Sequence, residues 1–532
     1  MDYKNMSKEE LIEYIKKLNE DQTGKYGLIW DREKQPEETV FSCNKYIPVL
    51  KHIENKDINC NGSIENILIE GDNFHSLSAL HYTHKEAIDV IYIDPPYNTG
   101  KEFIYNDDLV NEEDGYRHSK WLNFMQKRLK LGKELLKSTG VIFISIDDNE
   151  QAQLKLLCDS IFGEINFVSS FVVIRAEGGG LAKQVIKGHD YLLVYCKDIS
   201  EFSPLAKEKD IRGKKVISEG IEYWVQEDWL RKEFGKYGNC HYEELLTYKD
   251  KKTKEAIDKG LEEGKYQLIK KDNGLHIIGK LRRIDEDSSK FYSILKHLNK
   301  DGVIDLKKFD LEESFDYPKP VSLIKELVLG ATFFIKKKKP IILDFFAGSG
   351  TTGQAVLELN KKDGGNRQFI LCTNNENEIC DKITYPRLKQ CILGSKNIEK
   401  LGTNLKYFKT DFVENVGTRD QLYYDLTEKC IPMLCLKEET FEKLDLNEEY
   451  AIYTNKENSK YTCVYFDIFG NKYEEFKRKL EEIEEQKSLY IFALGDYVNT
   501  NDLKDVKNYT IEAIPYRILD LYKKVIKMSK ED

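Results

Sequence analysis

Long apolar runs are missing from this 532-residue sequence. No stretch approaches the roughly 18 consecutive apolar residues that a membrane-spanning helix needs. The first twenty residues, MDYKNMSKEELIEYIKKLNE, also lack the apolar core of a signal peptide. The eleven cysteines are scattered without a CxxC pair, which disfavours a zinc site. We therefore expect a cytoplasmic protein with no membrane partner and no metal.

Two sequence signatures of large nucleic-acid enzymes are also missing. No GxxxxGK[ST] loop occurs, so we expect no ATP-driven motor in this chain. No convincing nuclease constellation, internal repeat or low-complexity linker is present. What is present is a 40% hydrophobic composition rich in Tyr, Phe and Ile, which argues against disorder. This length predicts a large core and two or three domains.

The formal net charge of −10 at first counts against a nucleic-acid partner. Net charge describes the whole chain, however, whereas phosphate binding depends on one local face. Basic clusters occur at residues 207–215, 248–255, 270–283 and 336–339. Any one of them is more often a solvated surface than a binding site. Their concentration between the two motifs described below is what indicates a binding face.

Apolar runs alternate with helical patterns over much of the chain. Short runs at 66–70, 89–93 and 140–146 resemble buried parallel strands, and helical spacing covers 118–137. Residues 167–175 and 190–197 suggest a strand hairpin, and the pattern loosens from about 200 to 315. Strand and helix then alternate again around 341–346, and a small α+β region follows 410. This order predicts a doubly wound α/β sheet.

The stretch IYIDPPYNTG, residues 91–100, runs from an apolar strand directly into an acid, two prolines and a tyrosine. A surface turn could use prolines, because they fix φ and favour an extended residue before them. A turn has no need, however, for an acid and an aromatic ring held rigidly at a strand end. We therefore interpret Asp94, Pro95, Pro96 and Tyr97 as a site.

A second motif, DFFAGSGTTG at 344–353, lies between an apolar strand and a helix. Gly348, Gly350 and Gly353 match GxGxxG in the context that a nucleotide-type cofactor requires. A tight turn without a ligand is the structural alternative. Glu376 follows the next strand, where a carboxylate for ribose hydroxyls would be needed. The acid and aromatics before the glycines, and the absence of other oxidoreductase features, favour S-adenosylmethionine over a dinucleotide.

DPPYNTG followed by DFFAGSG resembles the amino-methyltransferases of DNA, in particular the β-order adenine enzymes. The amino-acid sequence of these motifs is most similar to that of the modification subunits of type III restriction–modification systems. Further segments carry the resemblance, which covers roughly residues 25–200 and 315–410: ILIEGDNFHSL (67–77), GVIFISIDDNE (140–150), GHDYLLVYCKD (188–198) and DYPKPVSLIKELV (316–328). It implies a Rossmann-like methyltransferase sheet with circularly permuted motif order and S-adenosylmethionine as cofactor.

The resemblance also implies which residues contact the cofactor. Those in the glycine turn are Phe345, Phe346, Ala347, Gly348, Ser349, Gly350 and Thr351. Lys319 and Pro320 match the segment that closes over the methionine end, Asp72 matches an element near the adenine, and Glu376 remains the ribose candidate.

Some of these assignments have alternatives. Asn375 could share the role of Glu376, and Asp72 could equally be a helix N-cap. Asp147 and Asp148 are left out of the site because they suit an acidic helix start.

The chemistry explains why DPPY suits an exocyclic amino group. The lone pair of that nitrogen is delocalised into the ring, so two acceptors must take hydrogen bonds from its two protons. Asp94 and the Pro95 carbonyl would supply them, and Tyr97 would stack on a base flipped out of the duplex. Positioning and electrostatics would supply most of the catalysis. Asp at position 94 resembles the adenine class, because cytosine enzymes of the family generally carry Ser there.

The predicted domains follow from these matches: an N-terminal helical arm (1–63), a catalytic half (64–200), a target-recognition domain (201–315), a cofactor-binding half (316–410) and a C-terminal α+β domain (411–532). Expected partners are double-stranded DNA, a second copy of the chain in a homodimer, and a separate ATP-dependent restriction subunit. The alternatives are a solitary adenine methyltransferase, methylation of cytosine or RNA, and a non-catalytic DNA-binding protein with a relic cofactor fold.

Overall fold

The structure is a computed structural model. It describes residues 30, 39, 43, 45–60, 62–99, 116–177, 185–211, 213–218, 220–233, 238–284, 286–312, 315, 317–415, 419–467 and 470–530. The helix expected at 7–20 lies outside these residues. The chain divides into two compact units, the first made of 1–203, 292–328 and 335–532 and the second of 204–291 and 329–334.

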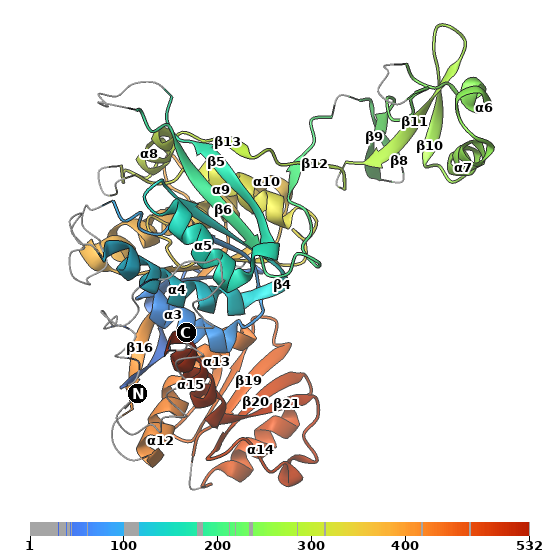
Figure 1. Ribbon diagram of the computed structural model, residues 1–532. Coiled ribbons are helices and arrows are strands. Elements are labelled where there is room, and N and C mark those ends of the chain that lie inside the picture. The colour runs from blue at the N-terminus through green and yellow to red at the C-terminus, as the bar shows by residue number, and fades with distance from the viewer. Residues whose placement is uncertain are drawn as a thin grey trace, which may run out of the picture. The chain divides into compact units, whose positions relative to one another are not determined.

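A ten-stranded sheet forms the centre of the first unit, in the order β1-β16-β2-β15-β14-β3-β4-β6-β5-β13 (Figure 1). The strands are β1 (Tyr46–His52), β2 (Glu65–Glu70), β3 (Ile88–Ile93), β4 (Leu136–Ile146), β5 (Phe167–Ile174), β6 (His189–Cys196), β13 (Ile294–Lys296), β14 (Ile341–Asp344), β15 (Gln368–Thr373) and β16 (Asn404–Glu414). The six strands from β16 to β4 run parallel, whereas β1 and β6 are antiparallel to their neighbours.

Helices cover the sheet on both faces. One layer contains α3 (Asn73–Thr83), α4 (Arg117–Leu135) and α5 (Gln151–Phe162), which pack against one another. The other side carries α9 (Val321–Thr332), α10 (Thr351–Asp363) and α11 (Tyr385–Leu393), and a short α8 (Asn299–Lys307) precedes α9 (Figure 1). Strands between two helix layers have no solvent face, which explains the continuous apolar runs of β3 and β15. The predicted fold class, a doubly wound α/β sheet, is confirmed.

The C-terminal region forms a second sheet within the first unit, in the order β17-β18-β19-β20-β21. Its strands are β17 (Glu442–Leu446), β18 (Tyr450–Thr454), β19 (Lys460–Tyr465), β20 (Gln486–Ala493) and β21 (Tyr509–Pro515), and its helices are α12 (Arg419–Lys429), α13 (Ile431–Glu438), α14 (Tyr473–Glu482) and α15 (Tyr516–Lys530). Helices α13 and α15 pack on α3, and Tyr82 of α3 donates a 3.0 Å hydrogen bond to Glu512 of β21. This α+β region therefore shares one core with the central sheet.

The second unit contains a four-stranded antiparallel sheet, β10-β11-β9-β8, and a two-stranded ribbon, β12-β7. The strands are β7 (Ala206–Glu208), β8 (Lys215–Ser218), β9 (Ile221–Gln226), β10 (Tyr266–Lys270), β11 (His276–Arg283) and β12 (Ser288–Lys290), and the helices are α6 (Leu245–Tyr248) and α7 (Lys251–Glu262). Buried Asp287 accepts hydrogen bonds from Trp224 and Arg282, which ties the ribbon to the sheet. The predicted recognition domain, 201–315, covers residues 204–291 of this unit but not 329–334, and it also includes β13 and α8, which belong to the first unit.

No helix among the described residues is both long enough and apolar enough to cross a bilayer.

Candidate active site

The two sequence motifs leave the sheet side by side. Strand β3, which ends at Ile93, pairs in parallel with β14, which ends at Asp344, through Val90–Ile342 and Ile91–Leu343. The DPPY segment and the glycine turn therefore start from neighbouring strand ends at one edge of the sheet, although about 250 residues separate them in sequence. Ligands gather at this edge in open α/β sheets.

A three-residue cluster forms around Asp94. The Tyr97 hydroxyl donates to Asp94 Oδ1 at 2.8 Å, and Lys319 Nζ donates to the Tyr97 hydroxyl oxygen at 2.6 Å. The same Nζ lies 3.4 Å from Asp94 Oδ1. Burial and the negative charge of Asp94 raise the pKa of the Tyr97 hydroxyl well above 10, so it stays a donor at neutral pH. The structure therefore places Lys319 against DPPY, whereas the resemblance had assigned it to the methionine end.

Asp190 is a member of this cluster that the sequence did not single out as a site residue. It is 4% exposed and lies 3.4 Å from Lys319 Nζ and 2.9 Å from the Arg175 guanidinium. Lys319 thus lies between two carboxylates, which fixes its ammonium group beside Tyr97. The signal was available, because Asp190 belongs to the matched segment GHDYLLVYCKD.

The two prolines present their carbonyls differently. Trp121 Nε1 of α4 donates to the Pro96 carbonyl at 2.7 Å, whereas no described residue donates to the Pro95 carbonyl. Asp94 Oδ2 also receives no hydrogen bond within the described part of the chain, since Tyr97 uses Oδ1. Two acceptor atoms of the DPPY segment therefore have no donor among the described residues.

A buried carboxylate supports the residue that follows the tyrosine. Asn98 has a left-handed backbone, with φ of 53°, and donates to Glu150 Oε1 at 2.5 Å. His118 Nδ1 lies 2.6 Å from the same oxygen. Burial raises the pKa of Glu150, which is fully buried with Oε2 unpartnered among the described residues. Helices α4 and α5 thus hold the loop after DPPY through one acid, which was seen in the sequence only as part of a matched segment.

The glycine turn is shaped by two left-handed glycines. Gly348 has φ of 48° and Gly350 φ of 79°, conformations that L side chains rarely adopt. A Cβ on Gly350 would lie 3.1 Å from Thr384, and one on Gly348 would lie 3.2 Å from the Phe315 ring. The Thr384 hydroxyl also donates to the Gly348 carbonyl at 2.6 Å. Gly350 then caps α10, whose first backbone N–H groups have no partner within the helix.

The remaining residues of the turn divide by burial. Phe345 is fully buried and packs near Gly132 of α4, so it belongs to the core. Phe346 is 7% exposed and packs against Phe124 with a ring separation of 5.9 Å. Ala347 donates its N–H to the Cys372 carbonyl at 3.1 Å. The turn therefore depends on packing beneath it as well as on its glycines.

Asp344 stands between the two motifs as a buried acid. Its oxygens accept from Phe346 N at 3.0 Å and from the Thr352 hydroxyl at 2.6 Å. Burial raises the pKa of this carboxyl to about 7, and the negative charge of Asp94 contributes. The main cause of the raised pKa is that burial excludes water from this carboxyl group.

Asp72, which the resemblance places near the adenine, caps α3. Its Oδ1 accepts from Phe74 N at 2.7 Å and His75 N at 3.3 Å, while Oδ2 lies 3.6 Å from the buried Arg128. The N-cap alternative is therefore realised in the structure. The carboxylate retains 24% exposure, so a second role as a ligand stays a prediction.

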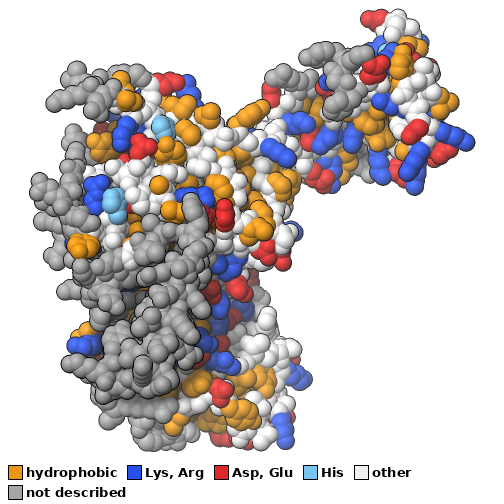
Figure 2. Space-filling model, in the orientation of Figure 1, with side chains coloured by type: hydrophobic (Ala, Val, Ile, Leu, Met, Phe, Trp, Pro, Cys, Tyr) orange, Lys and Arg blue, Asp and Glu red, His pale blue; other side chains and the backbone are white. Residues whose placement is uncertain are grey.

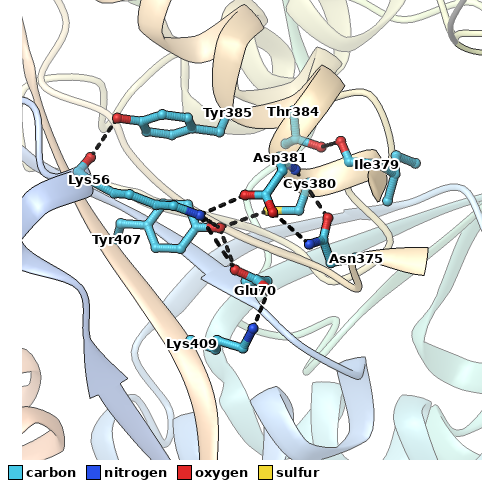
Figure 3. A network of polar contacts seen from close by, with 10 residues as sticks. All are labelled: Lys56, Glu70, Asn375, Ile379, Cys380, Asp381, Thr384, Tyr385, Tyr407 and Lys409. Atoms are coloured by element: carbon cyan, nitrogen blue, oxygen red, sulfur yellow. Dashed lines mark hydrogen bonds and ion pairs between the residues drawn. The ribbon is translucent and has the colours of Figure 1, made fainter. Parts of the chain in front are cut away.

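A network of polar side chains connects the end of β2 with β16 and with residues after β15 (Figure 3). Glu70, the last residue of β2, accepts from the hydroxyl of Tyr407 and from Lys409, each at 2.7 Å. Lys56 Nζ donates to the Tyr407 hydroxyl oxygen at 3.1 Å and to Asp381 at 2.6 Å. The network joins β2 and β16 to the segment that follows β15.

That segment carries Glu376, the ribose candidate. Asn375 donates to Asp381 Oδ2 at 2.8 Å and accepts from Asp381 N at 3.1 Å, so both ends of its amide are engaged (Figure 3). Glu376 is half-buried at the start of a short 3-10 helix, Glu376–Glu378. The ribose role of Glu376 therefore stays a prediction.

Comparison with known proteins identifies the family to which this chain belongs. A family model described as DNA methylase, of the N6/N4 methyltransferase type, matches residues 88–385, more than half of the chain. That range contains both the DPPY segment and the glycine turn. The chain belongs to the DNA methylase family.

Individual relatives are more specific. The chain is 33% identical to the type III restriction–modification enzyme StyLTI Mod subunit of Salmonella typhimurium, over 63% of this chain and 57% of that protein. It is 31% identical to the EcoPI Mod subunit of Escherichia phage P1, over 59% of this chain and 58% of that protein. It is 34% identical to the type II methyltransferase M.KpnI of Klebsiella pneumoniae, over 57% of this chain and 79% of that protein. The chain thus spans a little over half the length of the Mod subunits.

The residues present fit S-adenosylmethionine. The two left-handed glycines bend the chain tightly into α10, and the first N–H groups of this helix have no partner within the helix, as an anionic group at a helix N-terminus requires. Thr351, Ser349 and the backbone of the turn would hold the methionine end, and Glu376 the ribose. No group of three or more potential metal ligands occurs in the described part of the chain.

Proposed function

We propose that the protein is a site-specific DNA methyltransferase that transfers a methyl group from S-adenosylmethionine to the exocyclic amino nitrogen of adenine in duplex DNA. Its role would be that of the modification subunit of a type III restriction–modification system. One observation carries the proposal: Asp94 Oδ2 and the Pro95 carbonyl receive no hydrogen bond from a described residue, and their segment leaves β3 directly beside the strand that leads into the glycine turn.

The acceptors match what an amino group requires. An adenine amino nitrogen has two protons, and bonds from these to Asp94 Oδ2 and the Pro95 carbonyl would localise the lone pair away from the ring. Tyr97 and Lys319 hold Oδ1, so the carboxylate cannot rotate away from the base. The base must leave the duplex to reach this site, which costs a few kcal/mol. Asp94 need not be a strong base, since the nitrogen loses its proton only after methylation.

The cofactor would supply an electrophilic methyl group on a positively charged sulfur. The chain's own contribution is to place that group and the base on neighbouring strand ends, β14 and β3. The Trp121 and Glu150 contacts hold the DPPY loop before substrate arrives, so little reorganisation is left for the reaction.

The second unit would recognise the target sequence. Strand register places Lys215, Lys270, Lys280 and Arg282 on one face of its four-stranded sheet. Figure 2 shows Lys and Arg side chains over this unit, interspersed with acidic ones. Contacts from such side chains to phosphates would give affinity, and a few others would read base edges.

The partners follow from the same assignment. The relatives named as Mod subunits support a separate restriction subunit as partner, which would supply the ATP-dependent functions that this sequence does not encode. We propose a homodimer, with the C-terminal region as one docking surface, working in the cytoplasm where the DNA lies. The second candidate is a methyltransferase that acts without a restriction subunit, and the similarity to M.KpnI, named as a type II methyltransferase and not as a Mod subunit, supports it.

The direct test is methyl transfer from tritiated S-adenosylmethionine to duplex DNA, followed by nucleoside analysis. We expect N6-methyladenine with the wild type and none with Asp94→Ala, which should retain its fold and bind the cofactor. Label on cytosine would show that the enzyme methylates cytosine instead of adenine, and label on RNA alone would contradict a DNA substrate. A wild type that binds cofactor but is as inactive as Asp94→Ala on all DNA would favour a non-catalytic protein. Co-expression and co-purification with a restriction subunit would separate the type III role from the solitary one.

A further inference from the structure

Arg387 of α11 lies directly beneath the glycine turn and is fully buried. Its Nη1 donates to the Ser349 carbonyl at 3.2 Å, to Ser349 Oγ at 3.1 Å and to Thr351 Oγ1 at 3.0 Å. Its Nε donates to Gln354 Oε1 at 2.8 Å. Every one of these partners is neutral and belongs to the turn or to the first helical residues after it.

This guanidinium differs from the other fully buried arginines in having no acid beside it. Arg367 is paired with Asp363 at 2.8 Å, and Arg128 lies 3.6 Å from Asp72. Among the described residues, no carboxylate lies within 4.0 Å of Arg387, and its Nη2 has no hydrogen-bond partner at all. The pKa of Arg387 is lowered to about 10 by burial, so the side chain is still charged at neutral pH. The acids that act on it, Asp305 and Glu358, do so from beyond ion-pair distance, and a buried charge without a contacting counter-ion is costly.

The bonds from Arg387 also determine which way the neighbouring hydroxyls point. An arginine can only donate, so Ser349 Oγ and Thr351 Oγ1 accept from it. These two oxygens are 3.2 Å apart, and one hydroxyl hydrogen can serve the bond between them. The other hydrogen needs a further acceptor. This second hydroxyl hydrogen and the N–H groups at the start of α10 that have no partner within the helix are both donors. Donors and positive charge therefore converge on the turn.

We propose that Arg387 is a positioning residue that makes the glycine turn a receptor for one carboxylate, that of the methionine moiety of S-adenosylmethionine. This rests on the proposed function and adds a residue that lies just beyond the matched family segment, 88–385. Arg387 acts through Ser349 and Thr351, and the ligand carboxylate supplies the missing countercharge.

The test uses two ligands that differ only in the carboxylate, S-adenosylmethionine and decarboxylated S-adenosylmethionine. Their Kd values are measured by calorimetry on the full-length chain, as wild type, Arg387→Gln and Arg387→Lys. We expect the wild type to prefer the carboxylated ligand, and Arg387→Gln to reduce that preference at least about tenfold, which is about 1.4 kcal/mol. Arg387→Lys should restore part of it, because the charge remains.

Arg367→Gln is the matched control. Arg367 is equally buried but pairs with Asp363 at the opposite end of α10, so its substitution should lower stability and leave the ligand preference unchanged. An Arg387→Gln protein that weakens both ligands by the same factor would overturn the inference, because a purely structural residue would do that. A wild type that binds neither ligand would overturn the proposed function and this inference together.

Discussion

At the scale of single residues, the site depends on a few side chains with more than one partner. Tyr97 combines an aromatic face with a hydroxyl that donates to Asp94 and accepts from Lys319. These two capacities are separable by substitution, because phenylalanine keeps the ring and loses the hydroxyl. The same is true of Asp344, whose shape can be kept in asparagine while its charge is removed.

We expect Tyr97→Phe to slow methylation about 30-fold and Tyr97→Ala to reduce it below detection. Removing a hydrogen bond to a charged group costs about 2 kcal/mol, which corresponds to about 30-fold in rate. The alanine variant also lacks the stacking face. Single-turnover rates with saturating cofactor measure this. Equal rates for the two variants would mean that the ring contributes nothing.

We expect the ligand-free protein to become less stable as pH rises from about 4 to about 7, and Asp344→Asn to flatten that part of the curve. The pKa of Asp344 is raised from 3.8 to about 7 by burial, so between these values the folded state binds more protons than the unfolded state. Stability is thus fully present below the unfolded pKa and declines as pH rises through the folded one. The contribution is about 4 kcal/mol at most. Urea unfolding at several pH values tests it, and identical pH slopes for the two proteins would contradict it.

At the scale of elements, two helices fix the loop that leaves β3. Trp121 of α4 donates a hydrogen bond to the Pro96 carbonyl. Glu150, the N-cap residue of α5, accepts a hydrogen bond from the Asn98 side chain. Both helices therefore hold the loop, and Asn98, its residue with a left-handed backbone, is bound by a buried carboxylate.

We expect Glu150→Ala to lower kcat about 10- to 100-fold while changing the Kd for S-adenosylmethionine by less than about threefold. The buried Asn98 amide would be deprived of its acceptor, and an unsatisfied buried group costs about 1–3 kcal/mol. Glu164→Ala, which removes an exposed acid in the same region, is the control. A parallel weakening of cofactor binding would mean that Glu150 supports the whole domain instead of this loop.

Sequence predicted the elements far better than the contacts between them. The strands expected at 89–93 and 341–346 were readable because buried parallel strands are continuous apolar runs, although β14 ends at Asp344, two residues earlier than predicted. The cluster of Lys319 with Asp94 and the isolation of Arg387 were not readable, because they depend on helices that are distant in sequence packing on one sheet edge. Asp72 shows the opposite limit, since its N-cap geometry was foreseen but its ion pair with Arg128 was not.

At the scale of the whole molecule, chemistry and proposed recognition lie in separate compact units. All residues of the candidate active site belong to the first unit, and the basic face of the four-stranded sheet belongs to the second. The two tasks should therefore respond separately to mutation.

We expect Lys215→Gln combined with Lys270→Gln to weaken DNA binding and to reduce the slope of log K against log salt by about 1.8 in magnitude, which is about 0.9 for each phosphate that a lysine no longer neutralises. Both lysines are exposed on one face of the second unit. Lys504→Gln with Lys507→Gln removes the same charge from the C-terminal region and should leave the slope unchanged. Cofactor affinity should not change in either protein. An unaltered slope in the first double variant would place the DNA elsewhere.

The second unit interrupts the chain after β6 and returns it at β13, between the DPPY strand and the glycine-turn strand. Because β3 and β14 pair directly, and the side chains that hold the DPPY segment come from outside the stretch between β6 and β13, that stretch contributes no described contact to the alignment of the two motifs. Recombination within that stretch of the gene could therefore install a new specificity in one event, while the inherited chemistry passes on unaltered. Under the proposed function, this layout would let the sequence specificity of methylation diversify quickly.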